Sequence, residues 1–463
     1  MSNIENQADK QADTQAENPA EVRAGSTEQN KASGNKRQPQ PERAALMRDH
    51  NFRWLLGGGA ISMLGDQFTM MALPWLVLKL TGDALTMGLV IALMGVPRAI
   101  FILVGGALVD RHSPKTVLML TKYVNGALLG LLAAMVMTNN VNIPLIYAMS
   151  LVIGLASAFS IPSGSAILPH TIAREHLQAA NGMLMGIRQI TSLAGPLMAG
   201  LLIGLGGDGG HAGGPADARG LGLAFGFDCF SFLFSAWTLA QVKPLHRPAP
   251  AAPQPMFAAI GAGLSMVWRD SALRTCFAYW AVVAFFVGGS FQVAMPVLAN
   301  NSLGGATALG LVMGAHGVGT LLGMAASSVG GKLRIVNLGV TMLVIDFVAG
   351  CLLLPMGHLT ATWQAASLML VLGTLAGFMQ VSVFTWMQRR VPPEMLGRAM
   401  SIFMFIFMGL APMSAMLAGW LMQTISVAQL FEGSAGLLIL FAVLAFLFTP
   451  MRTLEDNAKT EVA

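Results

Sequence analysis

Charged residues are scarce in this sequence. Asp, Glu, Lys and Arg together make up 11% of its 463 residues, whereas apolar residues make up 54%. Soluble domains carry about 25% charged residues. A chain with so little charge cannot cover a water-facing surface, which excludes an ordinary soluble protein and predicts a protein that lies in lipid.

Cysteine is rare, and the short motifs of common enzymes are absent. Cys229, Cys276 and Cys351 lie in apolar stretches without paired spacing, which argues against disulfide bonds and metal ligation. The chain has no G-x-x-x-x-G-K-[ST], so we do not expect ATP to drive it directly. It also lacks H-E-x-x-H, C-x-x-C and G-x-S-x-G. We therefore expect neither an enzyme nor a bound cofactor.

Two further absences concern nucleic acid and secretion. No basic face with interleaved aromatic residues indicates nucleic-acid binding, although the net charge is +5. The first 45 residues are rich in Gln, Asn, Glu, Ala and Lys, with almost no large apolar residue before Leu46. They contain no apolar signal-peptide core and predict a disordered cytoplasmic tail over 1–50.

Long apolar runs fill the rest of the chain. A membrane span needs about 20 apolar residues. Twelve runs of this kind are present: 54–78, 85–108, 116–137, 143–165, 180–205, 221–241, 275–298, 306–329, 336–356, 362–386, 399–424 and 431–449. The sequence predicts an all-α membrane protein with twelve transmembrane helices.

A proline-rich stretch, KPLHRPAPAAPQP, separates the first six runs from the last six. Proline cannot continue a helix, so this stretch marks a linker. Phe257, Ile260, Leu264 and Trp268 recur behind it at helical spacing and predict an amphipathic helix on the membrane surface. The predicted units are a tail (1–50), a first six-helix bundle (51–242), a linker with its helix (243–273), a second six-helix bundle (274–450) and a tail (451–463).

The distribution of Lys and Arg predicts the orientation. If the N-terminus is cytoplasmic, the five cytoplasmic connections hold twelve of these residues, and the six outer ones hold only Lys79 and Arg219. Cytoplasmic loops are enriched in Lys and Arg. Both termini are therefore expected in the cytoplasm of a bacterial cell, with the chain in the inner membrane.

The connection between the second and third runs reads GALVDRHSPKTV (106–117). It resembles the signature loop of the major facilitator superfamily, roughly G-x-x-x-D-R-x-G-R-K/R, through Gly106, Asp110, Arg111 and Lys115. Ser113 and Pro114 depart from that pattern. The resemblance implies that Asp110 meets Arg398 at the start of the eleventh run and closes the cytoplasmic side in one state.

Other segments refine this resemblance. Residues 51–82, 168–183 and 263–274 look like the macrolide-efflux branch of drug:proton antiporters, which also includes siderophore exporters. The fifth run, ITSLAGPLMAGLLIG (190–204), is similar to the antiporter motif G-x-x-x-G-P-x-x-G-G through Gly195, Pro196 and Gly200. The family fold implies two six-helix pseudo-repeats around a central cavity, and the branch implies a monomer that exports small molecules in exchange for protons.

Ionisable residues inside the apolar runs are candidate functional residues, because charge is costly in lipid. Asp66 and Arg98 lie roughly 20 Å and 18 Å from the cytoplasmic side at 1.5 Å per residue, which suggests a proton-linked pair near the membrane midplane. The other candidates for the coupling site or the substrate cavity are Arg188, Asp228, His316 and Asp346. Lys122 is close enough to the cytoplasmic end of its run to extend its ammonium to the membrane surface.

The residues leave several functions open. Proton-coupled export of amphipathic drugs or metabolites is the leading reading, and a dedicated siderophore exporter is its variant. An importer of a small solute remains in the same class. A channel or a membrane sensor belongs to another class, but no filter-like segment or signalling domain stands out in the sequence.

Overall fold

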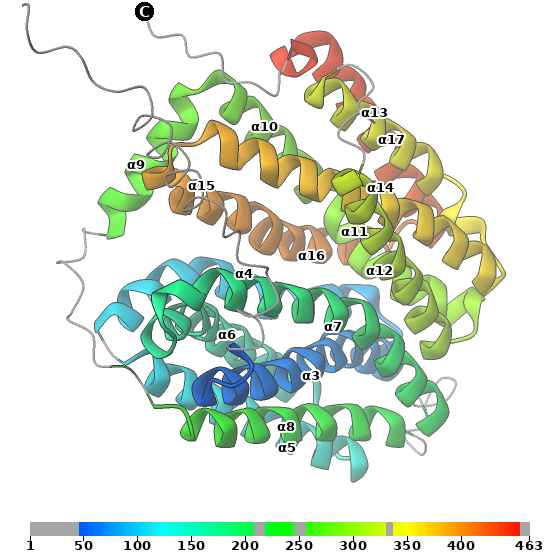
Figure 1. Ribbon diagram of the computed structural model, residues 1–463. Coiled ribbons are helices and arrows are strands. Elements are labelled where there is room, and N and C mark those ends of the chain that lie inside the picture. Colours follow the sequence, from blue (N-terminus) through cyan, green and yellow to red (C-terminus); the bar gives the residue numbers. More distant parts are fainter. Residues whose placement is uncertain are drawn as a thin grey trace, which may run out of the picture. The chain divides into compact units, whose positions relative to one another are not determined.

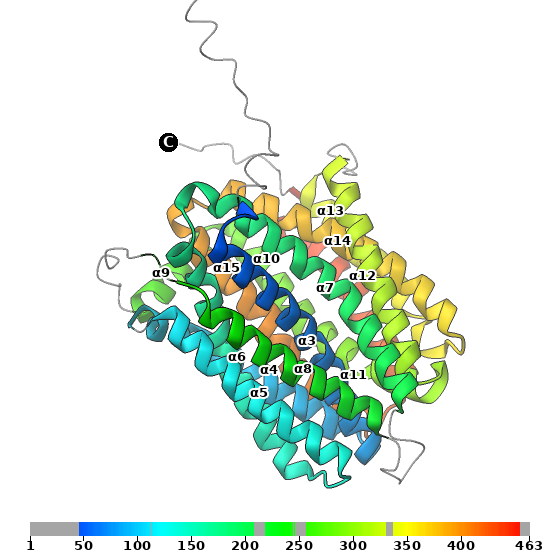
Figure 2. The same cartoon turned by 60° about the horizontal axis from the view of Figure 1, so that its bottom comes forward.

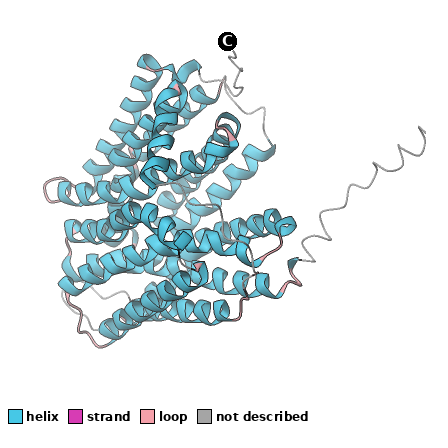
Figure 3. Ribbon diagram, turned by 90° about the vertical axis from the view of Figure 1, so that its left-hand side faces the viewer, coloured by secondary structure: helices cyan, strands magenta, loops and turns pink. Residues whose placement is uncertain are grey.

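The computed structural model describes residues 46–111, 113–207, 218–243, 245, 256–329 and 337–453, and helices dominate them (Figure 3). Within these ranges, twelve helical segments are long and apolar enough to cross a membrane. The predicted number of spans is therefore confirmed.

Six long helices form the first half, shown in blue to green in Figure 1. They are α3 (His50–Thr81), α4 (Ala84–Arg111), α5 (Pro114–Met137), α6 (Ile143–Thr171), α7 (Leu177–Gly206) and α8 (Arg219–Ala240). Asp49 caps α3, because its carboxylate accepts a hydrogen bond from the Phe52 amide at 2.7 Å. Gly82 ends the helix in the left-handed conformation, with φ of 63°, which glycine adopts without steric cost.

The second half begins after the linker helix α9 (Met256–Arg269). Its helices are α10 (Ser271–Val283), α11 (Gly289–Leu298), α12 (Ala306–Val329), α13 (Leu338–Leu353), α14 (Thr362–Arg390), α15 (Pro393–Phe405), α16 (Ala411–Leu421) and α17 (Val427–Phe448). A π-helical turn at Ala284–Gly288 joins α10 to α11, and another at Ile406–Leu410 joins α15 to α16. The apolar runs predict both spans but do not indicate their π turns.

Each half packs mainly through its own helices. In the first half α3 lies against α7 and α8, α4 against α6, and α5 against α6 and α8. In the second half α12 lies against α14, α13 against α17, and α11 against α16. The halves meet mainly through two pairs of helices, α4 with α16 and α7 with α12 (Figures 1 and 2).

These two crossings lie toward one side of the molecule. We call the side on which α3 begins side A and the side on which it ends side B. On α7 the contacts run from Leu193, which meets Gly317 of α12, to Gly204, which meets Thr307. At the centre a Cβ atom added to Gly200 would lie 2.6 Å from Gly310 Cα, so only glycine permits this approach. On α4 the contacts run from Ala84, against Gly419, to Ala99, against Gly409. We call the two crossings together the side-B interface.

Toward side A, α7 is less closely packed. None of residues 181–190 is buried, on any face of the helix. Cβ atoms added to Gly182 and Gly186 would meet no atom within 4 Å, in contrast to Gly200. The halves are therefore closed along side B and separate along α7 toward side A.

The two halves begin in the same way. The residues R-D-x-x-x-R precede and open both the first span (48–53) and the seventh (269–274). Asp49 caps α3, and Asp270 caps α10 by accepting hydrogen bonds from the amides of Ala272 (2.9 Å) and Leu273 (3.1 Å). This shared start supports the predicted pair of six-helix repeats.

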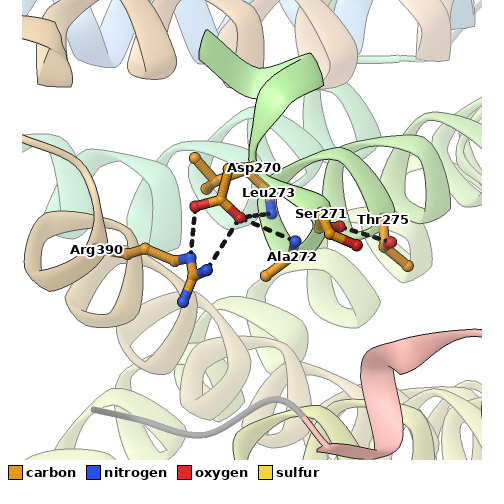
Figure 4. Close-up of polar contacts among 6 residues, drawn as sticks. All are labelled: Asp270, Ser271, Ala272, Leu273, Thr275 and Arg390. Carbon is orange, nitrogen blue, oxygen red and sulfur yellow. Dashed lines mark hydrogen bonds and ion pairs between the residues drawn. The ribbon is translucent and has the colours of Figure 1, made fainter. Parts of the chain in front are cut away.

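Asp270 also joins the start of its half to the end of α14. Arg390 Nε lies 2.8 Å from Asp270 Oδ2, and Arg390 Nη2 lies 3.0 Å from Oδ1 (Figure 4). Partial burial acts to raise the pKa of Asp270, but the hydrogen bonds from Arg390 and from the Leu273 amide outweigh it and hold the pKa below its usual value of 3.8. The bidentate pair therefore stabilises the folded state while Asp270 is ionised.

We expect Arg390→Gln to lower the free energy of unfolding by about 2 kcal/mol, because it removes two charge-assisted hydrogen bonds. A carboxylate with a lowered pKa contributes its stability above pH 3.8 and loses it as the pH falls below that value. The difference in Tm between wild type and variant in detergent should be full at pH 7 and shrink toward pH 3. Arg389→Gln, at the exposed neighbour, is the control, and an equal loss in both variants would contradict the role of the pair.

Candidate functional site

Asp66 lies in the middle of α3, where the chain needs no charge for solubility. Its side chain is exposed, and Lys122 and Arg98 interact electrostatically with its carboxylate. The next residue, Gln67, packs against Gly195 of α7, near the point where the contacts of α7 with α12 end. Asp66 therefore sits where the separation of the halves begins, on its side-A edge.

Asp228 of α8 interacts electrostatically with Asp66 and is fully buried. Thr69 of α3 donates a short hydrogen bond to Asp228 Oδ2, and the Ser231 hydroxyl donates one to Oδ1 at 2.8 Å. Gly65 allows α3 to approach α8 here, since a Cβ atom at that position would overlap both Asp228 and Ser231. Buried carboxylates require partners of this kind.

Lys122 of α5 is the fourth member of this group. The prediction that its ammonium extends to the membrane surface is wrong. The side chain does not extend to the membrane surface; it is 9% exposed, and Lys122 Nζ donates to Ser62 Oγ at 2.5 Å. The ammonium also lies 4.9 Å from the centroid of the Phe232 ring and in electrostatic contact with Asp66 and Asp228. Lys122 turns inward because α3 and α8 offer a hydroxyl, an aromatic face and two carboxylates, which together replace water.

Arg98 lies on α4 and is half-buried. Its Nε atom is buried without a hydrogen-bond partner, and within the described part of the chain no ion pair joins it to Asp66. The two residues nevertheless interact electrostatically. The neighbouring Ala99 belongs to the side-B interface, so Arg98 lies beside the contacts between the two halves.

The remaining candidates lie apart from this group. Arg188 is exposed on the separated part of α7. In the second half Tyr279 of α10 donates a hydrogen bond to Asp346 Oδ2 at 2.6 Å. His316 of α12 is half-buried, and its ring centroid lies 6.4 Å from that of Phe291. The structure thus brings together Asp66, Arg98 and Asp228, adds Lys122, and leaves Arg188, His316 and Asp346 elsewhere.

The antiporter-like motif is a packing surface. Gly195 meets the Gln67 side chain, Gly200 meets Gly310 across the two halves, and the Pro196 carbonyl lies 2.9 Å from a Cβ atom added at Gly310. Small residues let helix backbones approach closely in membranes. The motif therefore connects the site around Asp66 to the side-B interface.

The loop motif is only partly described. The side chains of Gly106, Asp110 and Arg111 lie outside the described residues, as does the predicted approach of Asp110 to the eleventh span. Lys115 Nζ donates to the carbonyl oxygens of Ala240 (3.1 Å) and Val242 (2.7 Å), so it caps the end of α8 within its own half. Arg398 packs against Gly263 of the linker helix α9.

The chemistry open to this group of two carboxylates and two cations depends on the exposure of its carboxylates. Its carboxylates differ: Asp66 is exposed and Asp228 is enclosed. The described residues hold no cluster of His, Cys, Asp and Glu fit for a metal ion. An exposed carboxylate between cations, within a membrane span, is suited to binding and releasing a proton.

Comparison with known proteins identifies the family. A model of the Major Facilitator Superfamily matches residues 55–416. The multidrug efflux pump Tap of Mycolicibacterium fortuitum is 24% identical over 419 residues, which cover 85% of this chain and 95% of that protein. The enterobactin exporter EntS of Salmonella choleraesuis (strain SC-B67) is 26% identical over 360 residues, or 76% of this chain and 81% of that protein.

Solved structures share the fold. The nucleoside transporter NupG has a TM-score of 0.66 at 16% identity and covers 87% of this chain and 99% of its own. A bacterial homologue of the iron transporter ferroportin, in an inward-facing state, has a TM-score of 0.59 at 16% identity and covers 85% and 97%. With twelve spans in two six-helix halves and a family model over most of its length, the chain belongs to the Major Facilitator Superfamily and is a multi-pass membrane transporter, not an enzyme.

Proposed function

We propose that this transporter exports amphipathic drugs or metabolites across the bacterial inner membrane in exchange for protons. The observation that carries the proposal is Asp66, an exposed carboxylate in the middle of a span, with Arg98 and Lys122 in electrostatic contact. A carboxylate in this setting releases its proton when a cation comes closer and takes one up when the cation withdraws. Loading and release of a proton are the steps that coupled transport requires.

Alternating access follows from the two sides of the molecule. With side A in the cytoplasm, as the distribution of Lys and Arg favours, the state described here is open to the cytoplasm and closed toward the outside. Opening outward requires the Gly200–Gly310 contact and the contacts of α4 with α16 to separate. The π turn at Ile406–Leu410 lies where α4 leaves this interface. Such turns are frequent at functional sites, and we assign it the role of a hinge.

The substrate class is proposed from the relatives and from the site. Two similar proteins are named as a multidrug efflux pump and an enterobactin exporter. The exposed Arg188 on the separated part of α7 offers a cation to an acidic group of a substrate. A siderophore exporter is therefore the second candidate within the same mechanism. We propose that the monomer is the working unit, since all residues of the site and both six-helix halves lie in one chain.

The experiment uses purified protein in liposomes that contain a pH-sensitive dye. A proton gradient is imposed, and macrolides, lipophilic cations and siderophores are added one at a time. Antiport predicts saturable proton movement that appears only with a transported compound. Saturable uptake of a solute along with protons would instead support an importer, and flux that rises without saturation would support a channel. Absence of proton movement with every compound, in folded protein, would contradict proton coupling for these substrate classes.

A further inference from the structure

Lys122 lies between the two carboxylates of the site without pairing to either. Its ammonium has three N–H donors. Among the described residues, Ser62 Oγ is the one hydrogen-bond acceptor that it reaches, at 2.5 Å, and no ion pair within 4.0 Å joins it to Asp66 or Asp228. Two donors of a buried cation are thus left for other partners.

The geometry of α3 places such a partner within reach. Ser62 and Asp66 are four residues apart on this helix, so their side chains are neighbours on one face, with Cβ atoms about 6 Å apart. A rotation of the flexible lysine side chain carries Nζ from the Ser62 hydroxyl to the Asp66 carboxylate. The face of Phe232, 4.9 Å away, stabilises the ammonium while it stays at Ser62.

We infer that Lys122 is a positioning residue of the coupling site, whose ammonium rests at Ser62 and Phe232 while Asp66 holds a proton and pairs with Asp66 after that proton leaves. This inference rests on the proposed proton exchange at Asp66 and adds its internal counter-ion. In this scheme Lys122 stays charged throughout. The proton passes between Asp66 and the water on the open side.

Lys122 suits this role better than Arg98 because of the helix that carries it. Helix α5 packs on α6 and α8 within the first half, whereas α4 takes part in the side-B interface. Lys122 therefore lies within the packing of the first half, whereas Arg98 lies beside the contacts between the halves. We assign Lys122 to holding the ionised state of Asp66 and Arg98 to making that state depend on conformation.

The other ionisable groups around Lys122 are few. Asp66 faces it from α3, and Asp228 faces it from α8, with Cys229 beside Asp228. Helix α4 contributes Arg98, which acts on Asp66. Helix α6 has Tyr147 and His170 near its two ends, away from the level of Lys122. A change at Lys122 or Ser62 thus acts mainly through the two carboxylates.

The test measures the pH midpoint of substrate-dependent proton movement in liposomes. Lys122→Gln removes the counter-ion, so Asp66 keeps its proton to higher pH, and we expect the midpoint to rise by about one pH unit. Ser62→Ala removes the resting place and favours the pair with Asp66, so the midpoint should fall. A lysine that served packing alone would not shift the midpoint in opposite directions in these two variants. Lys122→Arg keeps the charge, so its midpoint should lie close to that of the wild type.

The controls separate this inference from the proposed function. Lys79→Gln removes the same charge near the side-B end of α3, close to Trp75, and should leave the midpoint unchanged. If wild type moves protons with substrate but neither variant shifts the midpoint, the role of Lys122 is wrong and proton exchange stands. If wild type moves no protons with substrate, both fail. If Lys122→Gln does not fold, the direction of the midpoint shift in Ser62→Ala tests the inference by itself. This variant removes only one hydroxyl group, so it should fold.

Discussion

Asp66→Asn should reduce substrate-dependent proton movement to the level of protein-free liposomes. The substitution keeps the size of the side chain but replaces the carboxylate, which binds and releases the proton, with an amide that does not titrate. Substrate binding should survive, because an amide preserves the polarity of the exposed surface. The expected combination is retained binding, measured by equilibrium binding to detergent-solubilised protein, with abolished coupling in liposomes.

Asp83→Asn is the matched control for this prediction. Asp83 lies between α3 and α4 and caps α4 by accepting hydrogen bonds from the amides of Leu85 (3.1 Å) and Thr86 (2.9 Å). Asparagine also caps helices well, so the fold should be preserved. Both variants remove one carboxylate from the first half, but only one of them lies at the proposed site. Full proton movement in Asp66→Asn would remove Asp66 from the mechanism.

Gly200→Val should abolish transport by preventing closure of side B. A Cβ atom at this position would lie 2.6 Å from Gly310 Cα and 2.7 Å from the Ala306 carbonyl oxygen, which are backbone atoms that cannot turn aside. The two methyl groups of valine enlarge the overlap. The two halves therefore cannot close along side B in the state that is open to side A. Substrate flux in liposomes should fall to background, while the protein still elutes as a folded species.

Labelling of a single cysteine reports the interface directly. Thr307 packs against Gly204 at the side-B end of the same interface. With the three native cysteines replaced by alanine, Thr307→Cys should react slowly with an impermeant maleimide in the parent protein and rapidly in the Gly200→Val background. Gly433→Val on α17, where an added Cβ atom meets nothing within 4 Å, is the control. Unchanged labelling together with full transport would show that this contact need not form.

The number of spans and the family followed from the sequence because apolar runs and the loop G-A-L-V-D-R carry strong, local signals. Asp66, Arg98 and Asp228 were predicted by the cost of charge in lipid, and the structure brings the three together. The position of Lys122 along its apolar run led to a wrong prediction for its side chain. Lys122 lies eight residues into α5, roughly 12 Å along the helix axis. This depth alone does not distinguish an ammonium group that extends toward the membrane surface from one that turns inward.

The direction of Lys122 depends on Ser62, Phe232 and the two carboxylates, which lie on helices far away in the sequence. No local pattern in residues 114–137 encodes that choice. The π turn at Ile406–Leu410 is similar, because an extra residue in a helical turn leaves no mark on an apolar run. Gly195, Pro196 and Gly200 were recognised as a motif, but their partners Gln67 and Gly310 became visible only through packing between helices.

The most direct test of proton antiport is the direction of substrate flow when the proton gradient is reversed. Liposomes with the protein in one orientation receive a transported compound at equal concentration on both sides, first with an acidic interior and then with an alkaline one. Antiport predicts net accumulation inside the acidic liposomes, net loss from the alkaline ones, and neither when a protonophore is present. Accumulation inside the alkaline liposomes would indicate movement together with protons, and an unchanged distribution under both gradients would contradict proton coupling altogether.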